Sequence, residues 1–389
     1  MLADFRDRTY AVLVRMLPAS VAGHVLPGLI RQFRDTGVTS VRSAPRRLLI
    51  APVNSAGQGY AWARSAERIG DVAAANYMFR GADDVFGFVA DHVIPATALL
   101  SNERWRRAQR DAIFKNFTHM IIESGIHLVE SNGELLPLIR ELQQHGVRVA
   151  LLWHGSDIRL PSAHARREPD SPFGNGYPDT EILEQIASRN KAVVDEAAVA
   201  VFVSTPDLLA DVPQANWLPV VVEPSTWEAS SPALERERPV VLHVPSRAGL
   251  KGTALIEATM ARLHEEGVIE YREVHGVPVA QMPQLYAGAD IVLDQFLAGS
   301  YGVAACEALA AGRVVIGHVA DEVRRTVQEL TGHDVPIVQA RTTTLEASLR
   351  RIVADREEAR AMARRGPEFV RSVHDGRTSA EVLRPFLDS

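Results

Sequence analysis

The sequence predicts an α/β protein with two Rossmann-like, doubly wound parallel-sheet domains. Three observations carry this prediction. The 389 residues are too many for one ordinary hydrophobic core. Short apolar runs alternate with stretches of helical spacing, which is typical of parallel sheets covered by helices on both faces. A stretch with four prolines, 219–239, separates two such series and suits an interdomain linker.

The first series begins with an apolar run, 47–53, that reads as a buried strand and continues into a glycine-bearing loop. A helical stretch follows from Tyr60, and strand, glycine loop and helix together form the opening unit of a doubly wound sheet. Further strands are predicted at 120–122, 147–152 and 199–203, with helices over 135–145 and 182–196 between them.

The second series predicts strands at 240–244, 269–274, 289–296 and 313–318, followed by a charged helical stretch at 345–373. We therefore expect a helical segment at 1–46 packed on a first domain at 47–219. A linker at 220–238 and a second domain at 239–372 follow. The tail at 373–389 follows, and in one arrangement it packs back against the first domain.

Composition narrows the class of protein. The net charge of −6 argues against nucleic acid as a partner, because phosphate binding normally requires a basic excess. A single cysteine, Cys306, excludes an internal disulfide and fits a reducing cytoplasm. No apolar run approaches the length of a membrane span, and the amino terminus lacks a signal-peptide pattern.

The amino-terminal segment is basic, with eight arginines against three aspartates in residues 1–47. A basic amphipathic helix there could lie on an anionic membrane surface, which would place the protein at the inner membrane face. The alternative, which we expect, is a helix packed on the first domain with a solvated arginine face.

The stretch 299–312, Gly-Ser-Tyr-Gly-Val-Ala-Ala-Cys-Glu-Ala-Leu-Ala-Ala-Gly, carries most of the chemical information. It predicts a turn and a short helix between two strands, with the amides of Tyr301, Gly302 and Val303 at the start of the helix. Such a start binds anions, because its first amides lack partners and the helix dipole is positive there. Glu307 follows about one and a half turns later, within reach of a hydroxylated group beside the anion. Phosphate next to a sugar diol indicates a nucleotide.

With two such domains, the chain resembles the retaining glycosyltransferases of the GT-B fold, the group that includes glycogen synthases and bacterial polysaccharide glycosyltransferases. Three motifs in the family's order carry the resemblance: 154–159 (His-Gly-Ser-Asp-Ile-Arg), 245–253 (Pro-Ser-Arg-Ala-Gly-Leu-Lys-Gly-Thr) and 299–312. The resemblance covers roughly residues 47–373. It implies that the two domains face a central cleft. It also implies transfer of a sugar from a nucleotide diphosphate donor, most often UDP- or GDP-linked, to an acceptor hydroxyl with retention of anomeric configuration.

The resemblance implies a donor site in the second domain. Glu307 would accept hydrogen bonds from the ribose hydroxyls, a task suited to the two oxygens of a carboxylate. Lys251 and Arg247 would neutralise the diphosphate without a metal, and no Asp-x-Asp pair stands at a strand end. The expected donor-binding set is Glu307, Ser300, Tyr301, Gly302, Val303, Ser246 and Asp294.

The resemblance also assigns residues on the sugar and acceptor side. His154 ends a predicted strand and would face the donor sugar, so His154, Lys251 and Arg247 form the expected catalytic set. Asp157 either caps the following helix or joins the acceptor side, and Arg159 would hold an acceptor anion. The expected acceptor-side residues are Gly57, Gln58, Gly59, Glu123, Asp157 and Arg159. Gly57 and Gly59 are explained equally well by a tight turn between strand and helix, without any acceptor contact. We expect His243, His275 and His318 in supporting or core positions.

The sequence departs from the family at Gly299, where a second glutamate usually stands eight positions before Glu307. One interpretation is a different sugar contact, with Asp294 or Gln295 compensating. The other is lost activity, which would make the chain a non-catalytic nucleotide-sugar-binding subunit. A sugar-nucleotide epimerase would require acid and base carboxylates that we do not find. Expected partners are a nucleotide sugar and a small-molecule, lipid-linked or glycan acceptor, with no nucleic acid, metal or further cofactor.

Overall fold

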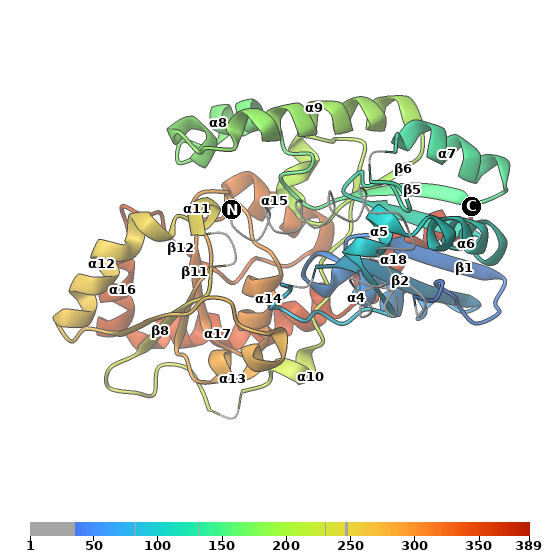
Figure 1. The fold of residues 1–389 in the computed structure, drawn as a ribbon. Coiled ribbons are helices and arrows are strands. Elements are labelled where there is room, and N and C mark those ends of the chain that lie inside the picture. The colour runs from blue at the N-terminus through green and yellow to red at the C-terminus, as the bar shows by residue number, and fades with distance from the viewer. Residues whose placement is uncertain (1–35, 82, 132, 230, 246–247) are drawn as a thin grey trace, which may run out of the picture. The chain divides into compact units, whose positions relative to one another are not determined.

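The structure, a computed structural model, describes residues 36–389 except 82, 132, 230 and 246–247. Two parallel sheets with helices connecting their strands make up this part of the chain (Figure 1). The predicted α/β class with two doubly wound sheets is confirmed. The basic residues 1–35, and with them most of the expected helical segment 1–46, lie outside the described residues.

The first sheet has seven strands in the order β3-β2-β1-β4-β5-β6-β7. Its strands are β1 (Arg46–Ala51), β2 (Val72–Arg80), β3 (His92–Pro95), β4 (His119–Glu123), β5 (Arg148–Trp153), β6 (Ala200–Val203) and β7 (Asn216–Trp217). The strand order reverses between β1 and β4, which pair in parallel with Leu48 opposite His119. Residues Leu48–Ala51 are fully buried, as expected for a strand covered on both faces.

Helices of this series include two that the sequence predicts, α7 (Leu135–Gln144) and α9 (Thr180–Ala197). Asn102 caps α6 by accepting a hydrogen bond from the Trp105 amide at 2.9 Å. The other helical elements are η1 (Ser55–Gly57), α4 (Gln58–Ala66), α5 (Ala96–Ser101), α6 (Glu103–Asn116), α8 (Pro161–Arg167), η2 (Pro172–Asn175) and η3 (Pro206–Ala210).

The second sheet has five strands in the order β12-β11-β10-β8-β9, so its order reverses between β8 and β10. The strands are β8 (Val240–His243), β9 (Glu270–Glu273), β10 (Ile291–Leu293), β11 (Val314–Gly317) and β12 (Val338–Gln339). The helical elements are α10 (Pro224–Trp227), α11 (Ala248–Lys251), α12 (Thr253–Glu265), η4 (Val279–Gln281), α13 (Met282–Ala287), α14 (Val303–Ala310), α15 (Asp321–Thr331), α16 (Leu345–Ala354), α17 (Arg356–Phe369), the π-helical η5 (Val370–His374) and α18 (Arg377–Leu387).

The core of the second sheet explains why these helices form. Ile256, Met260 and Leu263 recur at helical spacing along α12 and are fully buried against the strands. Helices α12 and α16 lie side by side next to the sheet (Figure 1). On α17, a Cβ added to Gly366 would come within 2.6 Å of the Leu309 carbonyl oxygen, so only glycine allows α14 and α17 to pack this closely.

Backbone packing divides the chain into two units. One comprises the described residues up to Leu152 together with Val193–Ala200 and Phe386–Ser389, and the other comprises Trp153–Ala192 and Val201–Pro385. In the first unit, Phe386 packs edge-on against His119, and Asp388 pairs with Arg46. The domain boundaries that we expected from the sequence stay predictions. None of the helices in the described residues is both long and apolar enough to cross a bilayer.

Arg313, immediately before β11, supports the second sheet from inside. Its side chain is 2% exposed and donates hydrogen bonds to the carbonyls of Ala311, Ala289 and Ser231 at 2.8, 2.9 and 2.6 Å. Three carbonyl groups, two of them in buried hydrogen bonds, therefore depend on one guanidinium.

We predict that Arg313→Met lowers the free energy of unfolding by about 3 kcal/mol, because methionine fills the space but leaves these acceptors unsatisfied. Urea denaturation measures the loss. The matched control is Arg325→Met at an exposed position of α15, expected to change stability by less than about 0.5 kcal/mol. Equal effects of the two substitutions would contradict this role.

Candidate functional site

The candidate site lies at the carboxyl ends of β8 and β10, where the strand order of the five-stranded sheet reverses. Ligands of open α/β sheets bind at such points. His243 at the end of β8 pairs with Leu293 of β10, and its Nδ1 donates to the Leu293 carbonyl at 3.0 Å. Its Nε2 then accepts from the Thr253 hydroxyl at 2.9 Å, and burial lowers the pKa of His243. The neutral imidazole of His243 therefore links the start of α12 to the carboxyl end of β10 through two hydrogen bonds.

Lys251 follows β8 and provides a cation at this point. Its Nζ lies 3.1 Å from Oδ1 of Asp294, which follows β10, and the two side chains are only 14% and 6% exposed. The chain contains 39 arginines but only three lysines, so a partly buried lysine at this position is unusual. Gly252 then turns the chain into α12 with φ of 79°, and a Cβ there would come within 3.1 Å of Leu297.

Helix α14 begins near the same edge, and its first amides are free of helical partners. Gly302 caps the helix in an extended conformation, and the first intrahelical bond runs from the Cys306 amide to the Gly302 carbonyl. The amides of residues 303–305 thus have no carbonyl within the helix. A Cβ placed on Gly302 would meet no atom of the described residues within 4 Å, which leaves space for a ligand beside these donors.

The Tyr301 side chain turns away from this space. It is 1% exposed, and its hydroxyl donates to Nε2 of His374 at 3.3 Å, while Nδ1 of His374 donates to the Val220 carbonyl at 2.8 Å. Burial lowers the pKa of His374 to about 4, which keeps this imidazole neutral. Tyr301 can therefore contribute only its backbone to a ligand at α14.

Glu307 is buried in α14 with 9% of its surface exposed. Burial raises its pKa to about 8, and the opposing charge of Lys251 only partly offsets this effect. Among the described residues no group donates a hydrogen bond to its carboxylate. The side chain is thus an acceptor whose ionised form receives no hydrogen bond from the described residues, as expected of a group that accepts hydrogen bonds from the hydroxyls of a ligand.

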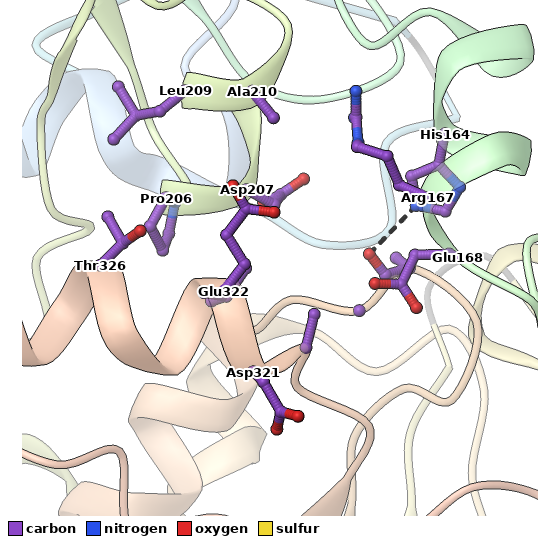
Figure 2. Close-up of a pocket in the computed structure, with 14 residues that line it drawn as sticks. His164, Arg167, Glu168, Pro206, Asp207, Leu209, Ala210, Asp321, Glu322 and Thr326 are labelled. Atoms are coloured by element: carbon purple, nitrogen blue, oxygen red, sulfur yellow. Dashed lines mark hydrogen bonds between the residues drawn. The ribbon is translucent and has the colours of Figure 1, made fainter.

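A pocket of about 330 Å³ opens where Ala298 and Gly299 precede α14. This volume is at the lower end of the range for small-molecule sites. Arg167 and Glu168, at the end of α8, lie on one side, and residues of η3 and α15 lie opposite them (Figure 2). His164 ties α8 to this loop, because its Nε2 donates to the Ala298 carbonyl at 3.2 Å while Nδ1 accepts from Ser171.

The His154 motif occupies the end of β5, as expected. The Asp157 carboxylate accepts hydrogen bonds from the amides of His154 at 3.0 Å and Gly155 at 2.8 Å. Asp157 therefore stabilises the loop that precedes it and does not cap a following helix. This corrects the interpretation of Asp157 as a helix cap. Arg159 is 12% exposed and pairs with Asp207 of η3, with Nε 3.2 Å from Oδ2. Its charge is already balanced inside the protein, and its acceptor role stays a prediction.

The glycine loop of the first sheet is built as a tight turn. Gly57 has φ of 75°, and a Cβ on Gly59 would come within 3.3 Å of the Asn54 Cα. Glu123 is fully buried, and its Oε2 accepts from the amides of Val53 at 3.0 Å and Asn54 at 2.9 Å. These contacts give both glycines and Glu123 a role in the turn. Acceptor contacts of Gly57, Gln58, Gly59 and Glu123 stay predictions.

Two expected residues are not described by the structure, and one lies elsewhere than the sequence suggested. Ser246 and Arg247 are outside the described residues, so their contacts with the donor stay predictions. His275, which we expected in a supporting or core position, is exposed and pairs with Glu273, because β9 forms the edge of the sheet. No group of three His, Cys, Asp or Glu side chains in the described part of the chain could hold a metal ion.

Sequence reasoning missed the acidic and basic residues around the pocket, Glu168 and Arg167 of the α8 region and Asp207 of η3. They stand in charged or loop segments without motif spacing, and their neighbours are far away in sequence. Glu168 accepts a hydrogen bond at 2.8 Å from His318, 150 positions later. The only signal in the sequence was indirect, namely the missing carboxylate at Gly299.

Comparisons with known proteins agree with this architecture. Residues 241–384 match a family model described as glycosyl transferase-like. A search of curated proteins finds no significant match. Among solved structures, sucrose-phosphate synthase from Thermosynechococcus elongatus is 14% identical with a TM-score of 0.60, and the match covers 88% of this chain and 98% of that one.

Two further structures were solved with ligands. Anabaena HepE in complex with UDP and glucose is 13% identical (TM-score 0.55, covering 88% of this chain and 99% of that one). The catalytic domain of starch synthase IV from Arabidopsis thaliana, bound to ADP and acarbose, is 10% identical (TM-score 0.56, covering 89% and 100%). At these identities the likeness establishes the fold, and the GT-B fold implied by the resemblance is confirmed.

The raised pKa of Glu307 predicts a pH-dependent stability penalty. The carboxyl of Glu307 has a pKa near 4.5 in the unfolded chain and about 8 in the folded protein. Its contribution to the free energy of unfolding is therefore fully present below pH 4.5 and is lost as the pH rises to 8. Glu307→Gln removes the titration. We predict that its unfolding free energy exceeds that of the original protein by a margin that grows from pH 5 to 8 and reaches roughly 3 kcal/mol. Denaturant titrations across this pH range measure the margin, and a constant difference would contradict it.

Proposed function

We propose that this chain is a retaining glycosyltransferase that moves a sugar from a nucleoside diphosphate donor to an acceptor hydroxyl. The observation that carries the proposal is the convergence, at the edge where β8 and β10 end, of a partly buried lysine, a helix start whose first amides lack partners within the helix, and a buried glutamate. The glycosyl transferase-like match of residues 241–384 supports it. So does the fold shared with HepE, which was solved with UDP-glucose, and with starch synthase IV, solved with ADP.

Each part of a nucleotide sugar has a matching group in this arrangement. The diphosphate would lie against the amides of residues 303–305, with Lys251 as counter-charge. The ribose hydroxyls would donate to Glu307, whose ionised form would gain hydrogen bonds that no described residue provides. The sugar would extend toward the pocket at Ala298 and Gly299, which lies only a few residues before the phosphate-binding amides.

The chemical step that we propose is departure and attack on the same face of the sugar. The bond from the anomeric carbon to the diphosphate oxygen breaks, and a bond to the acceptor oxygen forms on that face. The acceptor proton passes to the departing phosphate oxygen. Negative charge grows on the diphosphate as its bond breaks, and Lys251 and the α14 amides stabilise that charge. His154 would orient the sugar through its imidazole. UDP or GDP donors and a small-molecule, lipid-linked or glycan acceptor are the substrates that we expect.

Lys251 offers the most direct test of this mechanism. We predict that Lys251→Met, which keeps the aliphatic part of the side chain, lowers kcat/KM by about 100- to 1000-fold, because the leaving group loses its counter-charge. Release of nucleoside diphosphate from a panel of UDP- and GDP-sugars, in the presence of candidate acceptors, measures the rate.

Lys115→Met provides the matched control, since Lys115 is an exposed lysine of α6, and its rate should equal that of the original protein. Thermal unfolding of both variants separates a loss of folding from a loss of chemistry. A folded Lys251→Met protein with an unchanged rate would remove Lys251 from the mechanism.

Gly299 favours a second candidate function, a non-catalytic subunit that binds nucleotide sugars. The carboxylate that the family usually has at this position is absent from the chain's own motif. Thermal stabilisation by UDP or GDP, without turnover of any donor by the original protein, would favour this binding function over catalysis.

A further inference from the structure

The space above Gly299 is filled by a carboxylate from another part of the chain. A Cβ built on Gly299 would come within 2.8 Å of Oε1 and 2.9 Å of Cδ of Glu168, and the three nearest atoms all belong to that side chain. Gly299 itself has φ of 65°, a conformation that glycine adopts without strain. A glutamate at position 299 would start in the space that the Glu168 carboxylate occupies.

The Glu168 carboxylate is held in place by a chain of hydrogen bonds. Val319 donates its amide to Oε1 of Gln339 at 3.0 Å, which leaves the Gln339 amide nitrogen to donate to Nδ1 of His318 at 2.7 Å. Nε2 of His318 therefore carries the proton and donates to Oε2 of Glu168 at 2.8 Å. This network occupies one carboxylate oxygen, and no described residue donates a hydrogen bond to Oε1, the atom nearest Gly299.

Glu168 is also charged at neutral pH. Burial alone would raise its pKa, but the hydrogen bond from His318, with the nearby His164 and Arg341, lowers the pKa below the ordinary value. An ionised carboxylate accepts hydrogen bonds from hydroxyls more strongly than a neutral acceptor does. The side chain is 12% exposed and lines the pocket (Figure 2).

The two compensating residues that the sequence suggested have other partners. Asp294 is paired with Lys251 at 3.1 Å. The Gln295 amide nitrogen donates to the Ser300 carbonyl at 2.5 Å. Neither lies within the first contacts of a Cβ at Gly299, whereas Glu168 provides all three of them.

We propose that Glu168 is a sugar-binding residue that supplies, from the end of α8, the carboxylate missing at Gly299, and that its Oε1 accepts a hydrogen bond from a hydroxyl of the donor sugar. This assignment rests on the proposed function. It also removes the reason to regard Gly299 as a sign of lost activity, because the carboxylate is present and only its position in the sequence has changed.

The charge of the pocket determines which sugars fit beside Glu168. Among the described residues, the lining carries four carboxylates, Glu168, Asp207, Asp321 and Glu322, and one guanidinium, Arg167. Asp207 is paired with Arg159 and Arg167 with Asp211, so the unbalanced charge of the lining comes from the other three carboxylates. A further carboxylate would be repelled. The preferred donor is therefore a neutral hexose or an amino sugar, and UDP-glucuronate is disfavoured relative to UDP-glucose.

Calorimetry with bare and sugar-linked nucleotides tests the role of Glu168. The probes are UDP and GDP, together with UDP-glucose, UDP-N-acetylglucosamine, UDP-glucuronate and GDP-mannose. For the neutral nucleotide sugar that binds the original protein best, we expect Glu168→Gln to weaken binding about 10- to 100-fold, as for a lost hydrogen bond to a charged group. The affinity for the matching bare nucleotide should change less than about twofold. The ratio between the affinities for the neutral nucleotide sugar and for UDP-glucuronate should become smaller.

The matched control is Glu181→Gln, at an exposed position of α9 outside the pocket lining. It should leave both affinities unchanged. Equal weakening of bare and sugar-linked nucleotide by Glu168→Gln would overturn the assignment and make Glu168 a structural residue. An original protein that binds no nucleotide at all would overturn the proposed function, and the assignment with it.

A rescue experiment provides a second test, because a purely structural role of Glu168 would not predict that a second substitution restores affinity for the nucleotide sugar. Glu168→Ala should lose affinity for the nucleotide sugar, and adding Gly299→Asp should restore part of it, because aspartate tolerates positive φ and returns a carboxylate to the same space. In the original background Gly299→Asp should reduce affinity, since it crowds Glu168 with a like charge. If the two losses simply add in the double variant, the residues do not share one function.

Discussion

The ion pair between Lys251 and Asp294 joins the carboxyl ends of β8 and β10 at the point where the strand order of the five-stranded sheet reverses. A parallel sheet brings all its strands to the same edge, so the segments after β8 and β10 must share this place. Asp294 stabilises the partly buried ammonium of Lys251 by pairing with it. The ammonium in turn lowers the pKa of Glu307 and so opposes the effect of burial. The charge that a diphosphate would meet is thus set by the topology of the sheet together with this one pair.

Those parts of the site that depend on local pattern could be predicted from the sequence. The stretch 299–312 predicts a turn and a helix, and α14 occupies residues 303–310 because small side chains let it pack closely on α17. His154 and Lys251 follow strands that their apolar runs identify, so their positions at sheet edges required only the rule that parallel strands end together. The two-sheet architecture followed from the alternation of strands and helices, which recurs along the whole chain.

Contacts between distant segments could not be predicted in this way. Nothing near Glu168 indicates that it meets His318, and Arg159 gives no sign in the sequence of its partner Asp207. The raised pKa of Glu307 depends on how completely α14 is covered, and spacing alone does not reveal this. The same limit explains the interpretation of Gly299: its motif lacks a carboxylate, whereas the folded chain places one directly above it. A motif describes consecutive residues, but a binding site is defined by which side chains share a volume.

In the function that we propose, the start of α14 and Glu307 bind the diphosphate and ribose of one nucleotide. A crystal structure with bound UDP or GDP tests it most directly. The structure is expected to place phosphate oxygens within about 3.2 Å of the amides of residues 303–305, and both ribose hydroxyls at the same distance from the Glu307 carboxylate. Nucleotide bound at another edge of either sheet, or a ribose with no contact to Glu307, would contradict the claim.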